Sequence, residues 1–274
     1  FTLETYTGEG SMNNNDPFKI KQDGHIVWLT LNRPEKLNAM GFAFFKGLTE
    51  NIENFNKHPD VRAIIINAEG KDFTAGLDLT EAGSMLGQGS ADSRDALREK
   101  ILELQESINI IERCRKPVIA AVHGHCIGGG VDLLCACDIR IASKDAVFSI
   151  RETRIAIIAD LGTLQRLPHI IGGGRFRELA LTGRDFTADE ALKIGFITKV
   201  CEDRKELEKE AEKIALSIAE NPPLTVQGVK DVILFSRDNG IYPGLKYVAQ
   251  KNSAALPSED LIEAVGAFME KRKP

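Results

Sequence analysis

Three acidic side chains, Asp132, Glu152 and Asp160, lie in a stretch of the chain that is otherwise rich in glycine and hydrocarbon residues. Asp132 follows a run of three glycines at positions 128–130, separated from it by one residue. Glycines allow a ligand to approach the backbone closely, and free N–H groups at the start of a helix favour an anion. Carboxylates beside such a site can transfer protons while the amides stabilise negative charge. The pattern therefore predicts a catalytic pocket.

Each acid also has an ordinary interpretation. Asp132 falls in the expected first turn of a helix, where the helix dipole favours any aspartate. Glu152 could be a surface residue paired with Arg151 or Arg154, and such pairs are common and weak. Asp160 could cap the helix that follows it. Taken singly, none of the three acids establishes a site.

The neighbours of Asp160 favour chemistry. The apolar residues 155–159 precede it and Leu161 follows, so its carboxyl is expected to lie against hydrocarbon, with a raised pKa. A carboxyl that is protonated near neutral pH can donate a proton, while an ionised neighbour accepts one. A second loop, residues 70–79, follows an apolar strand and contains Gly76. Its N–H groups and those of the glycine run would together form an oxyanion hole.

Metal and nucleic-acid functions are not favoured. His123 and His125 are two residues apart at a strand end, a spacing more typical of packing, and Cys135 and Cys137 lack the spacing of common zinc or redox motifs. The net charge of −5 and isoelectric point near 5.7 argue against a nucleic-acid surface. No apolar run approaches the roughly 18–20 residues that span a bilayer, so no membrane partner is expected. The five cysteines, odd in number, indicate free thiols in a reducing compartment.

Periodicity predicts an α/β fold. Branched apolar runs typical of buried strands alternate with helical spacing, which indicates a sheet covered by helices on both sides, and the pattern after Leu161 is almost wholly helical. The expected strands are 25–31, 63–67, 117–122, 139–142 and 146–150. The expected helices are 42–55, 97–111, 204–218, 224–235, 242–255 and 258–271. We divide the 274 residues into an arm or junction at 1–16, a core at 17–221 and a helical region at 222–274.

Several motifs, taken in order, resemble the enoyl-CoA hydratase/isomerase (crotonase) superfamily from about His25 to the C-terminus. They are residues 32–39 (NRPEKLNA), 73–79 (FTAGLDL), 117–124 (PVIAAVHG), 128–132 (GGGVD), 137–140 (CDIR) and 162–168 (GTLQRLP). The resemblance implies a ββα superhelix core followed by helices that cover a site and form a trimer or a dimer of trimers. It also implies an acyl-CoA substrate and no separate cofactor, because coenzyme A is part of that substrate. Fatty-acid oxidation would place the chain in the mitochondrial matrix or the peroxisome.

The resemblance also assigns residues. The backbone N–H groups of Leu77 and Gly129, with Gly130 beside them, would hold the thioester oxygen. Two loops would border the coenzyme A moiety, through Arg33, Lys36, Ala39, Ala75, Gly76, Asp78, Leu79 and Thr80. Acyl-chain length would depend on Leu77, Met85, Leu86 and C-terminal side chains. No metal ligand is implied.

The three acids narrow the resemblance to one branch. Hydratases of the superfamily carry glutamates at the positions of Asp132 and Glu152 and a glycine at that of Asp160, whereas the full set here is similar to Δ3,5-Δ2,4-dienoyl-CoA isomerases. Our hypothesis is that Glu152 removes a proton from carbon 2 and Asp160 delivers one to carbon 6, while Asp132 tunes or orients the other two. An enoyl-CoA hydratase or Δ3,Δ2-enoyl-CoA isomerase remains the nearest alternative. A crotonase-like RNA-binding or assembly protein whose catalysis has lapsed is an alternative of another class.

Overall fold

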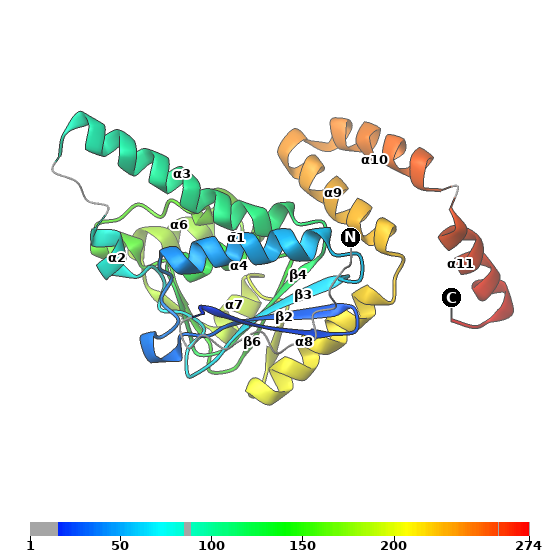
Figure 1. Cartoon of the computed structure of the whole chain (residues 1–274), viewed down its shortest axis with the longest axis horizontal. Coiled ribbons are helices and arrows are strands. Elements are labelled where there is room, and N and C mark those ends of the chain that lie inside the picture. The colour runs from blue at the N-terminus through cyan, green and yellow to red at the C-terminus, as the bar shows by residue number, and fades with distance from the viewer. Residues whose placement is uncertain (1–15, 85–88, 257, 274) are drawn as a thin grey trace.

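A computed structural model describes residues 16–84, 89–256 and 258–273. A six-stranded sheet lies between helices α1 and α3 on one face and α8 on the other, as Figure 1 shows. The expected sheet with helices on both sides is therefore confirmed. Most of the proposed N-terminal arm, together with Met85 and Leu86, lies outside the described residues.

The main sheet has the order β1-β2-β3-β4-β6-β9, and all neighbours are parallel except the antiparallel pair β1 and β2. A smaller sheet has the order β5-β7-β8, with β5 and β7 parallel and β7 and β8 antiparallel. The strands of the main sheet are β1 (Phe18–Asp23), β2 (Ile26–Leu31), β3 (Ala63–Ala68), β4 (Val118–Val122), β6 (Ile139–Ser143) and β9 (Lys199–Cys201). Those of the smaller sheet are β5 (His125–Ile127), β7 (Val147–Ser149) and β8 (Asp185–Thr187).

The α-helices occur between and after the strands. They are α1 (Phe42–Lys57), α2 (Leu79–Gly83), α3 (Ala91–Arg113), α4 (Gly129–Ala136), α5 (Thr163–Ile171), α6 (Gly173–Thr182), α7 (Ala188–Lys193), α8 (Arg204–Ala219), α9 (Pro223–Asn239), α10 (Ile241–Ala255) and α11 (Glu259–Glu270). Two short 3-10 helices are η1 (Pro34–Lys36) and η2 (Glu152–Ile155).

Strand β3 shows why the sheet needs cover on both faces. All six of its residues are buried, because successive side chains point to opposite faces of a strand. Ile64 and Ile66 belong to the larger core, which α1 and α3 cover, whereas Ala63 and Ile65 pack with residues of α8. The polar-to-apolar alternation that marks a half-buried strand is therefore absent from β3.

Some expected elements differ from the structure. The almost wholly helical pattern predicted after Leu161 is present as α5 to α11, and the exceptions are β8 and β9, which have only three residues each, too few to give a periodic signal. The edge strand β1 was not predicted because only Phe18 and Ile20 of its six residues are apolar. The strands expected at 139–142 and 146–150 are present as β6 and β7, but they belong to different sheets.

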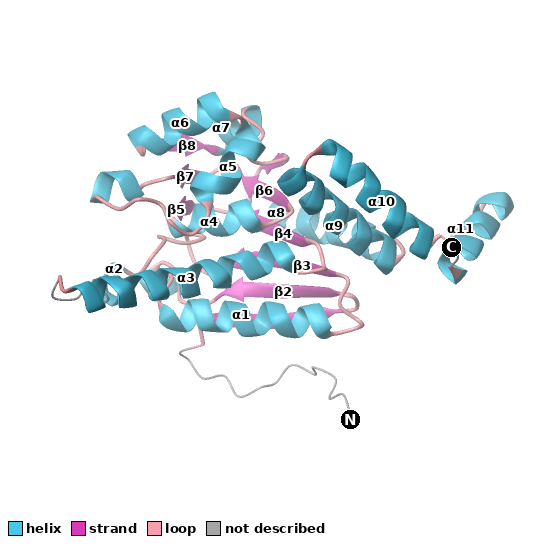
Figure 2. Cartoon of the chain, turned by 90° about the horizontal axis from the view of Figure 1, so that it is seen from above, coloured by secondary structure: helices cyan, strands magenta, loops and turns pink. Residues whose placement is uncertain are grey.

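Helices α9, α10 and α11 project from one side of the core, as Figure 2 shows most clearly. Many of their large apolar side chains are exposed, including Tyr242 and Phe268 at 81% and 82% of their accessible area. No helix in the described ranges is both long and apolar enough to cross a membrane. An exposed apolar surface of this extent is typical of helices that contact another protein surface.

Candidate active site

A cavity of about 320 Å³ contains all three predicted acids in its lining. Asp132 comes from the first turn of α4, Glu152 from the start of η2, and Asp160 from the loop before α5. The cavity is also lined by the loop before α2 and by apolar side chains such as Ile157 and Leu161. The fold thus brings together side chains that lie 28 positions apart in the sequence.

Asp132 is the most deeply buried of the three, with 1% of its surface exposed. Its Oδ1 accepts a hydrogen bond from the backbone N–H of Thr163, at 2.6 Å. Burial, and then the nearby charge of Glu152, raise the pKa of Asp132 to about 7, although the Thr163 bond opposes this shift. Its carboxylate therefore contacts the start of another helix, α5, and the helix-dipole interpretation alone does not account for its position.

Glu152 does not pair with either neighbouring arginine. Arg151 forms an ion pair with Asp185, and Arg154 donates to the carbonyl of Thr182. Oε2 of Glu152 is buried and has no hydrogen-bond partner among the residues described. Burial first, and the charge of Asp160 as well, raise the pKa of Glu152. An unpaired carboxylate oxygen facing a cavity is available to accept a proton from a ligand.

Asp160 does not cap a helix. Helix α5 begins at Thr163, and its N-cap is Gly162, which provides no side-chain bond. Asp160 is half-buried, and burial raises the pKa of its carboxyl. The hydrocarbon wall expected around it is only partial: Ala159 and Leu161 are buried, but Ile158 is 79% exposed and cannot contribute. The raised pKa is thus confirmed in direction, with fewer apolar neighbours than the sequence predicted.

The loop at Gly76 lies directly against the start of α4. Gly76 has φ +89°, and a Cβ there would lie 2.6 Å from the carbonyl oxygen of Ile127 and 3.5 Å from the nitrogen of Gly129. Neither Leu77 nor Gly129 donates its backbone N–H to an acceptor in the described part of the chain. Two unused N–H groups on adjoining loops beside the acids can bind an oxyanion.

Gly130 has a different role from its neighbour. A Cβ at this position would lie 2.4 Å from Cγ2 of Thr74 and 2.9 Å from Sγ of Cys126, so only glycine fits. Gly130 does not line the cavity, whereas Gly128 and Gly129 do. Gly128 was not predicted as a site residue; a Cβ there would lie 3.2 Å from Oε1 of Glu152. The absence of side chains at positions 128 and 130 therefore keeps both the helix start and the Glu152 carboxylate in place.

Of the eight residues assigned to coenzyme A, the structure brings Ala75, Gly76 and Leu79 to the cavity. Asp78 instead caps α2, and its Oδ1 accepts from the N–H of Thr80 at 3.1 Å. The residues that do not line the cavity are Arg33, Lys36, Ala39, Asp78 and Thr80. Arg33 and Lys36 belong to the neighbouring loop, which hydrogen-bonds to the Gly76 loop through Leu37 and Met40.

Asp72 and His125 form a rim pair that sequence analysis missed. The ring Nδ1 of His125 lies 2.7 Å from Oδ1 of Asp72, and the His125 backbone N–H donates to the same oxygen at 2.9 Å. Although burial opposes ionisation, these bonds lower the pKa of Asp72. His123, by contrast, is buried and bonds to the carbonyl of Gly70. Across the described ranges, no group of three or more histidine, cysteine or acidic residues has the geometry to hold a metal ion.

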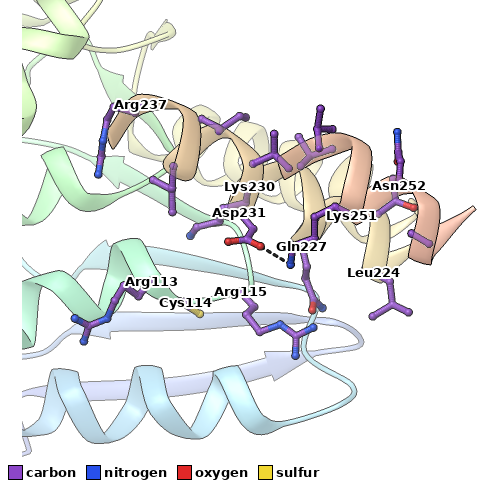
Figure 3. Close-up of a pocket in the computed structure, with 18 of the residues that line it drawn as sticks. Arg113, Cys114, Arg115, Leu224, Gln227, Lys230, Asp231, Arg237, Lys251 and Asn252 are labelled. Atoms are coloured by element: carbon purple, nitrogen blue, oxygen red, sulfur yellow. Dashed lines mark ion pairs between the residues drawn. The ribbon is translucent and has the colours of Figure 1, made fainter. Parts of the chain in front are cut away.

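A larger hollow of about 790 Å³ lies between α9, α10 and the end of α3 (Figure 3). Some of its charged side chains are paired: Asp231 with Lys251 at 2.6 Å (Figure 3), and the buried Lys230 with Asp138 at 2.6 Å. Cys114 in its wall is buried, as are the other four free cysteines, and burial raises its pKa. These paired charges and protonated thiol provide no group poised for acid–base chemistry, so the smaller cavity is the candidate active site.

Comparison with known proteins agrees with this geometry. A family model described as enoyl-CoA hydratase/isomerase matches residues 21–274. The chain belongs to the enoyl-CoA hydratase/isomerase family. The family resemblance inferred from the sequence motifs is thereby confirmed.

Two relatives within the family show how far the similarity extends. The peroxisomal Δ3,5-Δ2,4-dienoyl-CoA isomerase of Arabidopsis thaliana is 48% identical over 92% of this chain and 92% of its own length. The mitochondrial Δ3,5-Δ2,4-dienoyl-CoA isomerase of Mus musculus is 44% identical over 90% of this chain and 77% of its own length.

Solved structures confirm the fold. An enoyl-CoA hydratase of Bacillus anthracis superposes with a TM-score of 0.87 at 33% identity, covering 94% of this chain and 98% of that one. An enoyl-CoA hydratase homologue of Thermobifida fusca, solved in complex with CoA, gives a TM-score of 0.79 at 29% identity, covering 88% and 93% of the two chains. The expected crotonase-like α/β fold with C-terminal helices is therefore present.

Proposed function

We propose that this chain is a Δ3,5-Δ2,4-dienoyl-CoA isomerase that acts in the oxidation of unsaturated fatty acids. One structural observation carries the proposal: Asp132, Glu152 and Asp160 line a single cavity beside two unused backbone N–H groups. The names of the two isomerase relatives support the same reaction. Moving both double bonds by one carbon requires proton removal at carbon 2 and proton addition at carbon 6, and hence two groups at separate points of the cavity.

The acids have distinct roles. Glu152 is the base, because its Oε2 has no hydrogen-bond partner among the described residues and can accept the carbon 2 proton. Asp160 is the acid, because it lines the cavity at a point separate from Glu152 and, as for Glu152, burial raises the pKa of its carboxyl. Asp132 touches the start of α5 and changes the charge beside Glu152, so it orients and tunes the other two.

The N–H groups of Leu77 and Gly129 stabilise the thioester oxygen as it becomes a dienolate. Removal of one such donor typically costs about 2.7–4 kcal/mol of transition-state stabilisation, and a positioned acid or base contributes about 10²–10⁴ in rate. Gly130 supports this arrangement by packing against Thr74. Both contributions are needed. The base removes the weakly acidic carbon 2 proton, and the two N–H groups stabilise the negative charge that this creates on the thioester oxygen.

The substrate is an acyl-CoA thioester, and no separate cofactor is needed, because every proposed step is a proton transfer. Ala75, Gly76 and Leu79 contact its reactive end, and Arg33, Lys36, Ala39, Asp78 and Thr80 border the rest of the coenzyme A moiety. The two isomerase relatives are named as peroxisomal and mitochondrial, and we propose one of these compartments, the peroxisome or the mitochondrial matrix, for this chain.

We propose a homotrimer or a dimer of trimers, with residues 222–274 as the region that covers the site and contacts other subunits. The exposed apolar side chains of α9, α10 and α11 support this assignment. Neither nucleic acid nor a membrane is a proposed partner. The catalytically lapsed alternative is disfavoured by the net charge of −5 and by the retained acids.

The proposal is tested by assaying isomerisation of 3,5-dienoyl-CoA alongside hydration of crotonyl-CoA. We expect the first reaction to dominate, because Asp160 supplies the acid that water addition does not require. An enzyme that hydrates crotonyl-CoA but leaves the dienoyl thioester unchanged would be a hydratase instead. RNA retained on a filter at physiological salt, without turnover of either thioester, would favour the lapsed alternative.

A further inference from the structure

Asp160 lies at the boundary between two cavities. One is the 320 Å³ candidate active site, and the other is a separate cavity of about 440 Å³ on the far side of the loop before α5. Asp160 and Leu161 are the residues that line both. Asp132 and Glu152 line only the first, so Asp160 alone among the three acids borders the second cavity.

The second cavity is strongly polar. One wall is fixed by an ion-pair cluster in which Arg166 and Arg237 both bond to Glu112, and Arg166 also donates to Oδ1 of Asn109 at 2.7 Å. The hydrogen bonds of both arginines lower the pKa of Glu112, although burial opposes this, so the cluster stays charged. A cavity of this volume with such a lining can hold several water molecules, since each occupies about 30 Å³ in the liquid.

Helix α5 also contributes side chains to the second cavity that can hydrogen-bond to water. Gln165 and His169 lie four residues apart, on one face of α5, and both are exposed. Neither side chain hydrogen-bonds to another described residue. Gln105 closes the inner end by donating to the backbone carbonyl of Asp160 at 2.7 Å, which fixes the position of that residue. The polar lining of the second cavity thus includes Asp160 and two exposed residues of α5.

The proposed reaction creates a need for such a path. Each turnover leaves Glu152 with the proton from carbon 2 and leaves Asp160 ionised, because its proton has moved to carbon 6. The resting state returns either by transfer of that proton from Glu152 to Asp160 or by separate exchange with water. In the second case Glu152 releases one proton to solvent and Asp160 takes one from it, so the net change is zero.

We propose that Asp160 is reprotonated from solvent through the second cavity, with Gln165 and His169 as the positioning residues of this route. The carbon 6 proton of the product then comes from water rather than from carbon 2. This inference rests on the proposed isomerase activity. It requires that the substrate pocket be occupied on one side of Asp160 while the other side stays in contact with water.

The test follows deuterium through many turnovers in ordinary water, with 3,5-dienoyl-CoA dideuterated at carbon 2. NMR measures the deuterium at carbon 6 of the product. Deuterium found there has passed directly from Glu152 to Asp160 without exchange with water. The variants are the double substitution Gln165→Leu with His169→Leu, and the polar pair Gln165→Asn with His169→Gln. Gln22→Leu on β1 is the matched control, since it makes the same change at a position that lines neither cavity and lies outside residues 222–274.

We expect little deuterium at carbon 6 with the wild-type enzyme and with Gln22→Leu. In the leucine pair, deuterium at carbon 6 should rise and kcat should fall about 10-fold with KM unchanged, less than the roughly 10²-fold or greater effect of removing a direct acid. The polar pair, Gln165→Asn with His169→Gln, should again give little deuterium at carbon 6. Circular dichroism melting shows whether each variant is folded.

The possible results separate the two proposals. An enzyme that does not isomerise the dienoyl thioester at all contradicts the proposed function. High retention in the active wild-type enzyme shows direct return from Glu152 and overturns the solvent route. Equal retention and equal kcat in the wild-type enzyme and a folded leucine pair overturn the role of the second cavity, while the isomerase assignment stands.

Discussion

Replacing Asp132 by asparagine should make the folded protein more stable at alkaline pH. The site raises the pKa of Asp132 from an ordinary 3.8 to about 7, chiefly because the residue is buried. Between these two values the folded state binds a proton that the unfolded state has lost, so stability falls as pH rises through this window. Above about pH 7 both states are ionised at this residue, and the penalty of the buried charge is fully present.

The size of the effect follows from the two pKa values. Linkage gives a penalty from ionisation of Asp132 of about 4 kcal/mol at pH 8 and about 2 kcal/mol at pH 5, to order of magnitude. The asparagine side chain cannot ionise, and its carbonyl oxygen can still accept from the Thr163 N–H. Packing costs of the new amide do not depend on pH. The gain of the variant over the wild type should therefore be larger at pH 8 than at pH 5 by about 2–3 kcal/mol.

Urea unfolding followed by circular dichroism at pH 5 and pH 8, at one protein concentration, measures this difference. The wild-type protein is the reference at each pH, so titration of all other groups that the substitution leaves unperturbed cancels. A gain that is the same at both pH values, or larger at pH 5, would refute the claim that Asp132 is a buried acid with a raised pKa. Activity of the same variant should fall, because the charge beside Glu152 has changed.

Four further outcomes follow from the site. Glu152→Gln should lower kcat for dienoyl isomerisation about 10²–10⁴-fold without unfolding, and full activity would remove its role as base. Asp160→Asn should behave alike; if Asp160 were only structural, asparagine would serve nearly as well. Gly130→Ala should destabilise by about 1–3 kcal/mol in urea, because its Cβ would lie 2.4 Å from Thr74, and an unchanged midpoint would contradict that packing. The acid limb of kcat/KM should lie above pH 4.5, since burial raises the pKa of Glu152, and a limb at or below that value would contradict it.

Much of the main sheet could be predicted because its inner strands are rich in branched apolar residues. The strands β2, β3, β4 and β6 were expected within two residues of their observed bounds, since helices on both faces require continuous branched residues. The edge strand β1 and the three-residue strands give no comparable signal. The sequence pattern also could not predict which strands share a sheet. Strands β6 and β7 are neighbours in sequence, but each pairs with distant strands, so they belong to different sheets.

The acids of the site could be identified because they interrupt apolar and glycine-rich sequence. Their partners could not, because contacts such as Asp132 with Thr163, or Asp72 with His125, join loops that only the fold brings together. The 162–168 motif includes Thr163, but nothing in the sequence indicated that the backbone N–H of this residue donates a hydrogen bond to Asp132. The sequence also overestimated burial at Ile158. This residue belongs to the apolar run 155–159 that was expected to lie against Asp160, but its side chain is exposed.

The central claim is that Glu152 and Asp160 act at opposite ends of the dienoyl group, and hydrogen exchange at carbon 2 tests it most directly. Each variant is incubated with 3,5-dienoyl-CoA in deuterated water, and NMR follows deuterium at carbon 2 of the remaining substrate. Asp160→Asn should exchange this hydrogen faster than the enzyme-free control while forming almost no 2,4-dienoyl product, and Glu152→Gln should do neither. Exchange that persists in Glu152→Gln but is lost in Asp160→Asn would contradict the assignment of base and acid.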